Sequence, residues 1–109
     1  MEYHLIGSAS APERAITILA RLGVISGLSV TSANDSPERD PRSYLLSGSN
    51  DGMKFTEIAR GEVPAFSARF QEKAISFPND KAYSAYKLVF PALAGKGDIP
   101  MQIAEIELL

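Results

Sequence analysis

Two loops of this 109-residue chain carry polar and aromatic side chains of the kind that recognise ligands. The first, residues 34–41, reads NDSPERDP. The Arg39 guanidinium is a planar fork of donors suited to a carboxylate or to sugar hydroxyls, and Asn34 and Asp35 also suit hydroxyls. A structural role is the alternative, in which Arg39 ties its own loop together through Asp35, Glu38 or Asp40 while the two prolines stiffen the backbone.

The second loop, residues 65–70, places two aromatic residues around an arginine. If the rings are exposed, Phe66, Phe70 and the Arg69 guanidinium form a platform on which a ligand could stack. If Phe66 and Phe70 instead fill the edge of a hydrophobic core, the segment is structural. The sequence leaves both interpretations open.

The composition argues against catalysis and against several classes of partner. The chain has no cysteine, and His4 is the sole histidine, so no transition-metal site can be argued and a Ser-His-Asp triad would have to use His4. Neither a Gly-x-Ser-x-Gly elbow nor a phosphate-binding glycine loop is present. The formal net charge of -2 provides no basic field for nucleic acid. No apolar run approaches the roughly 20 residues of a membrane-spanning helix. We expect a non-enzyme with no nucleic-acid partner and no membrane span.

The elements that must position these loops read as short strands. Apolar and polar residues alternate at residues 28–31, 73–77 and 103–108, as they do in half-buried strands. Ile103 is out of phase with the rest of the last run unless a bulge intervenes. About eight such strands within one domain, residues 1–109, predict an all-β antiparallel sandwich of the jelly-roll type.

One hairpin is clearly marked. The apolar run at residues 44–46 leads into Ser-Asn-Asp-Gly at residues 49–52, and a second run follows at residues 53–58. Asn, Asp and Gly tolerate the backbone angles of a tight turn. We therefore expect a strand, a turn and a second strand that begins at Met53.

Residues 10–22 satisfy the local rules of two structures. Ser10 and Glu13 form a capping box, which favours a helix. The β-branched run at residues 16–18 favours a strand. We predict a strand from Ile16 to Ala20, with the helix as the alternative.

Four sequence blocks occur in an order that resembles a known family. They are residues 26–41, the YxLxGSNDGxxFxxIA pattern at 44–59, residues 82–91 with their Tyr-x-x-Tyr-Lys-x-x-Phe pattern, and the closing QIAEIEL at 102–108. Together they resemble a bacterial branch of the discoidin-like domains, also called F5/8 type C or galactose-binding-like modules. The resemblance covers about residues 15–109.

The resemblance implies a galactose-binding-like jelly roll that performs no chemistry and binds carbohydrate through loops at one end. It also implies a larger extracellular or cell-surface bacterial protein. The ligand-binding candidates are then Asn34, Asp35, Arg39, Phe66 and Arg69. The alternative hypothesis is a protein-interaction or structural module without a sugar site, and the absence of tryptophan favours it.

The same resemblance implies a structural calcium ion, with Glu105 on the last strand as one carboxylate ligand. Calcium takes six to eight oxygen ligands, yet no Asp precedes Ile16, so the early Asp-Gly loop of the family is absent or replaced. A shortened N-terminal region would also leave a sheet edge open. We expect residues 2–7 to cover that edge, or a second copy to pair with it in a homodimer.

Overall fold

The computed structural model describes residues 3–9, 15–19, 24–97 and 99–109. These residues form eight strands and one short 3-10 helix, in the order β1 (Tyr3–Ala9), β2 (Ala15–Leu19), β3 (Gly27–Ser32), η1 (Pro37–Arg39), β4 (Ser43–Ser49), β5 (Thr56–Glu62), β6 (Glu72–Ser76), β7 (Ala85–Val89) and β8 (Met101–Leu108). The all-β prediction is confirmed. None of the described residues belongs to a helix long and apolar enough to cross a membrane.

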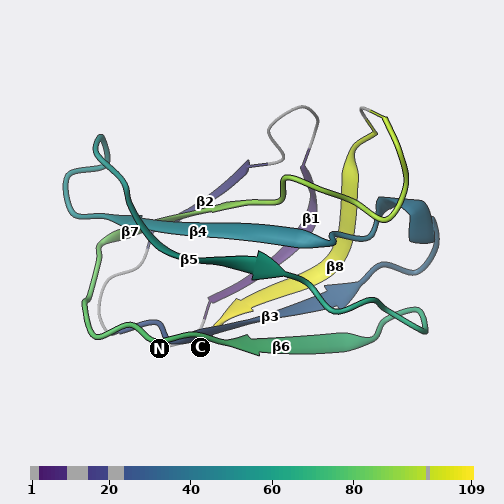
Figure 1. Ribbon diagram of the computed structural model, residues 1–109, viewed down its shortest axis with the longest axis horizontal. Helices are drawn as coiled ribbons and strands as arrows, with labels where there is room; N and C mark the ends of the chain where they lie inside the picture. The colour runs from purple at the N-terminus through teal and green to yellow at the C-terminus, as the bar shows by residue number, and fades with distance from the viewer. Residues whose placement is uncertain (1–2, 10–14, 20–23, 98) are drawn as a thin grey trace.

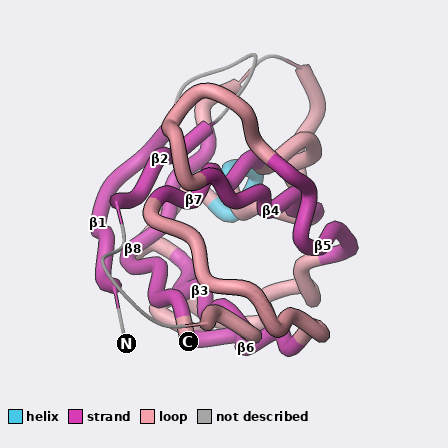
Figure 2. The backbone as a smooth tube through the Cα atoms, turned by 90° about the vertical axis from the view of Figure 1, so that its left-hand side faces the viewer, coloured by secondary structure: helices cyan, strands magenta, loops and turns pink. Residues whose placement is uncertain are grey.

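The strands form two four-stranded sheets that face each other (Figures 1 and 2). One has the order β1-β8-β3-β6 and the other β2-β7-β4-β5. Every paired strand is antiparallel to its neighbour. The predicted antiparallel sandwich is therefore the observed architecture.

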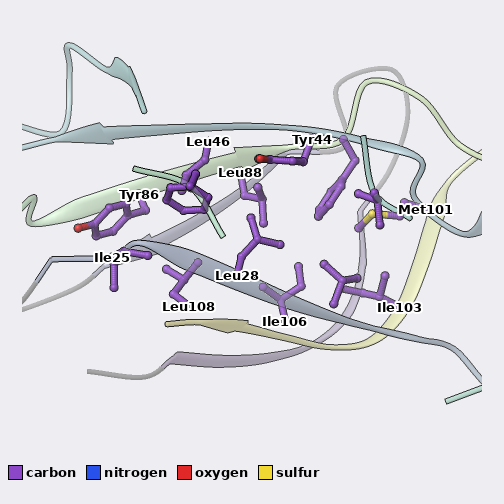
Figure 3. Close-up of a cluster of buried hydrophobic side chains, with 14 residues drawn as sticks. Ile25, Leu28, Tyr44, Leu46, Tyr86, Leu88, Met101, Ile103, Ile106 and Leu108 are labelled. Carbon is purple, nitrogen blue, oxygen red and sulfur yellow. The ribbon is translucent and has the colours of Figure 1, made fainter. Parts of the chain in front are cut away.

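The core lies between the two sheets (Figure 3). Leu28 and Val30 of β3 alternate with residues that point outward, and Leu46 of β4 and Leu88 of β7 face them from the other sheet. Burial of these apolar side chains is the main favourable term in folding. The alternation read from the sequence is thus the alternation of inward and outward side chains.

A bulge on β8 resolves the phase of Ile103. Ile103 and Ile106 are both buried, at 3% and 0% exposure, although three residues cannot separate two side chains on one face of a regular strand. The register shifts by one residue here against both neighbours of β8: Leu5 and Gly7 of β1 pair with Ile106 and Ile103, and β3 shows the corresponding shift. A bulge therefore accounts for the phase of Ile103.

The first two strands bear on two of the expectations for the N-terminal region. β1 pairs along β8 from Tyr3 to Ala9, so the edge of β8 is covered from within the chain. β2 confirms the predicted strand over Ile16–Leu19, where it pairs with β7. Ala20 and residues 10–14, where the alternative helix would begin, lie outside the described residues. Dimerisation through an edge stays a prediction.

The hairpin between β4 and β5 differs from the prediction in one respect. The turn is where the sequence placed it, with Gly52 at a φ of +75°, but β5 begins at Thr56 rather than at Met53. Asp51 Oδ1 accepts hydrogen bonds from the backbone N–H groups of Met53 and Lys54 at 2.8 and 2.9 Å. Because a side chain has taken these donors, they cannot join the strand ladder.

Gly48 on β4 allows a close approach of side chain to backbone. A Cβ atom at this position would lie 2.5 Å from two ring atoms of Tyr83. The Tyr83 ring in turn meets Tyr86 edge to face, with centroids 6.0 Å apart. The absence of a side chain at Gly48 therefore leaves the space that the Tyr83 ring occupies.

We predict that Gly48→Ala lowers the free energy of unfolding by about 1–3 kcal/mol, because the added methyl group overpacks the site. In a Tyr83→Ala background the same change should cost less than half as much, since the clashing ring is gone. Urea unfolding of the four proteins measures this coupling. Ser47→Ala is the control on the same strand, and an equal cost of Gly48→Ala in both backgrounds would contradict the packing argument.

The turn also predicts an acid dependence. Hydrogen bonds from Lys54 N–H, Met53 N–H and the Ser49 hydroxyl lower the pKa of Asp51. A carboxyl group whose pKa is lower in the folded state than in the unfolded state stabilises the fold at pH values above its unfolded pKa of about 3.9. This stabilisation is lost as the pH falls through the folded pKa. The wild-type protein should therefore have a higher melting temperature than Asp51→Asn at pH 7, and this difference in melting temperature should become smaller at pH 3.

Thermal melts of both proteins from pH 7 to pH 3 measure the gap. Asp80→Asn, at another exposed position, controls for the loss of one negative charge. A gap between wild type and Asp51→Asn that stayed constant with pH would refute the role of the carboxylate.

Candidate functional site

Three connections meet at one end of the sandwich, which we call the loop end. They are residues 33–42 between β3 and β4, 63–71 between β5 and β6, and 90–97 after β7, on the right of Figure 1. The last connection is bound to the first, since Ala94 N–H donates to Asp40 O at 2.9 Å and Gly95 N–H donates to Glu38 O at 2.7 Å. Backbone hydrogen bonds thus hold the candidate loop in place.

A bidentate ion pair between Arg69 and Asp40 joins the two candidate loops. Arg69 Nη1 and Nη2 donate to the two carboxylate oxygens of Asp40 at 3.0 and 2.7 Å, and the side chains are 26% and 5% exposed. Nη1 also reaches the backbone oxygen of Asp35 at 3.4 Å. The hydrogen bonds to Asp40 raise the pKa of the Arg69 guanidinium. Arg69 therefore positions the first loop from the second.

Arg39 does not hold its own loop, as one interpretation of the sequence had it. Asp40 is bonded to Arg69 instead, and Arg39 contributes its backbone N–H to Ser36 O at 2.9 Å within η1. Among the described residues, the Arg39 guanidinium makes no hydrogen bond or ion pair. Its donors remain available to a ligand.

The two aromatic residues of the second loop have different positions. Phe66 packs against the hydrophobic core. Phe70 is 65% exposed and has a φ of +54°, a conformation that costs energy for any residue with a side chain. Phe66 thus follows the structural alternative and packs against the core, whereas Phe70 has the exposed ring that the binding alternative requires.

The strained backbone of Phe70 is held by hydrogen bonds on both sides. The buried Ser32 hydroxyl donates to Ala68 O and accepts from Gln71 N–H, both at 2.9 Å. Phe70 N–H donates to Ala33 O at 3.4 Å. The backbone of Phe70 therefore lies next to Ala33, the residue that precedes the exposed Asn34 and Asp35.

Glu105 lies on β8, opposite Thr31 of β3. Within the described residues, no three Asp, Glu, His or Cys side chains form a group that could hold a metal ion. The described residues therefore do not supply a carboxylate set around Glu105. Calcium binding there stays a prediction from the resemblance.

We predict that Arg69→Met lowers the free energy of unfolding by about 2 kcal/mol or more, because it leaves the buried Asp40 carboxylate without its partner. The double variant Arg69→Met/Asp40→Leu should regain part of this loss, since the unpaired charge is removed as well. Urea unfolding measures both changes.

The pair of Arg60 and Glu57 offers a matched control. Its side chains are 67% and 46% exposed, and exposed ion pairs contribute little, so Arg60→Met should leave the unfolding midpoint nearly unchanged. Equal effects at Arg69 and Arg60 would contradict the positioning role of Arg69.

No family model matches the chain. A curated protein from Arabidopsis thaliana, "Peptide-N(4)-(N-acetyl-beta-glucosaminyl)asparagine amidase", is 36% identical over 59 residues. The match spans 53% of this chain and 8% of that protein. It therefore covers a small part of the amidase's length.

Solved structures match nearly the whole chain. CpGH89CBM32-5 from Clostridium perfringens, in complex with GalNAc-beta-1,3-galactose, is similar with a TM-score of 0.67 at 22% identity, over 99% of this chain and 74% of that one. The family 32 carbohydrate-binding module of C. perfringens NanJ, in complex with galactose, is similar with a TM-score of 0.65 at 17% identity. This match covers 90% of this chain and 67% of that one.

A third structure, the C-terminal domain of a chitobiase from Bacteroides fragilis, gives a TM-score of 0.57 at 15% identity, over 100% of this chain and 63% of that one. Identities this low establish the fold and nothing finer. The chain has the galactose-binding-like β-sandwich fold of the family 32 carbohydrate-binding modules.

Proposed function

We propose that this chain is a non-catalytic module that binds carbohydrate at its loop end. The observation that carries the proposal is the exposed Phe70 ring, whose backbone is held in a strained conformation and is hydrogen-bonded to Ala33, next to Asn34 and Asp35 in the chain. Strain and the exposure of a large apolar group both cost free energy. A ligand that covers the ring offsets the second cost.

The chemistry of the loop end suits a sugar. One face of a pyranose ring is apolar and can stack on an aromatic ring. Its hydroxyl groups can bond to the Asn34 amide, the Asp35 carboxylate and the Arg39 guanidinium. Arg69 has a different role in this proposal, because its guanidinium is paired with both carboxylate oxygens of Asp40. It positions the loop that carries the binding groups.

The comparisons support the proposal through the fold. Two of the similar structures are carbohydrate-binding modules in complex with galactose-containing ligands. The amidase match covers 8% of that protein and carries no argument for catalysis here. By the same resemblance, we propose an extracellular or cell-surface setting.

A protein-interaction module is the second candidate, and the exposure of Phe70 favours it too. Aromatic and arginine side chains are common among the residues that dominate protein interfaces. The two functions differ in the ligand that covers the ring, so titration with sugars separates them.

We predict that the folded chain binds galactose, N-acetylgalactosamine or GalNAc-beta-1,3-galactose, and that Phe70→Ala weakens this binding about 5- to 30-fold. The factor corresponds to the loss of about 1–2 kcal/mol of stacking. Isothermal titration calorimetry measures the affinity, in buffer with calcium and again with EDTA, so that any dependence on an ion at Glu105 is seen in the same experiment.

Met53→Ala removes an apolar side chain that is 85% exposed at the opposite end of the molecule, and it is the matched control. Sugar binding that survives Phe70→Ala unchanged would overturn the assignment of the ring. If the folded protein binds none of the three sugars, the protein-interaction module becomes the favoured hypothesis.

A further inference from the structure

A pocket lies at the other end of the sandwich, around the turn between β4 and β5, which is on the left of Figure 1. We call it the hairpin pocket. Its volume is about 270 Å³, and it is lined by Gly48, Ser49, Asn50, Asp51, Lys54, Thr56 and Tyr83. None of the candidate residues of the loop end is among them.

The walls of the hairpin pocket are fixed by interactions that the fold already needs. The Ser49 hydroxyl donates to Asp51 Oδ1 at 2.9 Å, and Asn50 Oδ1 accepts from Ser84 N–H at 3.0 Å. The Tyr83 ring packs directly against the backbone of Gly48, where a side chain would leave no room for it. A ligand would therefore meet a largely preformed surface, which lowers the entropy cost of binding.

Several polar groups of the pocket are left over once these interactions are counted. Asp51 uses Oδ1 for its hydrogen bonds to Ser49, Met53 and Lys54. Among the described residues, Asp51 Oδ2, the Asn50 amide nitrogen, the Lys54 ammonium and the Thr56 hydroxyl make no hydrogen bond. The pocket thus offers both donors and acceptors beside the Tyr83 ring.

The mixture of charges indicates the class of ligand. A phosphate or carboxylate would pair with Lys54 but would face the negative charge of Asp51. A metal ion would find a single carboxylate together with an ammonium group. A neutral polyhydroxylated ligand avoids both conflicts, since its hydroxyl groups donate to the carboxylate and accept from the ammonium group and the amide. Its apolar face can pack against Tyr83.

We propose that the hairpin pocket is a second carbohydrate-binding site, one that takes a single neutral sugar residue. The proposal does not depend on binding at the loop end. The molecule measures 35 Å along its longest axis, and the two sites lie at its two ends in Figure 1. If both are occupied, one module can link two glycan chains, and several weak contacts then act together.

The test is a titration of the ¹⁵N-labelled chain with galactose, N-acetylgalactosamine and glucose in turn. We expect backbone amide signals of residues 48–56 and 84 to shift with one dissociation constant of their own, on the order of 1–10 mM. Lys54→Ala and Thr56→Val, both at exposed positions, should each weaken this binding threefold or more. Thr56→Arg should abolish it by filling the pocket. Met53→Ala, on the same turn but outside the lining, is the matched control.

Signals of Ala33, Asn34 and Phe70 report the loop end in the same spectra. Shifts confined to the loop end, with residues 48–56 silent for all three sugars, would overturn the second site and leave the first intact. Shifts at residues 48–56 that neither Lys54→Ala nor Thr56→Arg reduces would overturn it as well. Shifts confined to the hairpin pocket would support this proposal and count against the loop end.

Discussion

Burial of apolar side chains between two facing sheets is the constraint on which the rest of this structure depends. The chain has no cysteine and therefore no disulfide, so the sandwich is held by packing and by backbone pairing. β8 is central to both, because it pairs with β1 on one side and β3 on the other. Its bulge brings Ile103 into the core beside Ile106 and so keeps the inward face apolar over its whole length.

The connections at the loop end are held by polar interactions, because they lie outside the hydrophobic core. Asp40 and Arg69 are bonded across two connections that are 29 residues apart in sequence, and Ser32 anchors the segment around Phe70 from within β3. Buried charged and hydroxyl groups are found where hydrogen-bond partners satisfy them, as here. The scaffold thereby presents a ring and several polar side chains in fixed positions, on a surface that would otherwise be mobile loops.

Much of the fold can be predicted from the sequence because strands of a sandwich alternate with a period of two. That period located β3, β6 and β8, and the break at Ile103 even located the bulge. The start of β5 could not be predicted, because the Asp51 side chain takes two backbone donors that would otherwise extend the strand. At the loop end, periodicity gives no guide. Nothing local distinguishes Phe66 from Phe70, and the partner of Asp40 is Arg69 rather than the adjacent Arg39 because tertiary structure decides it.

The first and last strands of the sandwich are neighbours in one sheet. Tyr3 of β1 pairs with Leu108 of β8, so the chain enters and leaves the sandwich on adjacent strands. Domains whose ends are neighbours can be inserted into a surface loop of a host protein, or circularly permuted, with little distortion of either partner. The adjacency of β1 and β8 accordingly suits this fold to insertion into a surface loop of another protein.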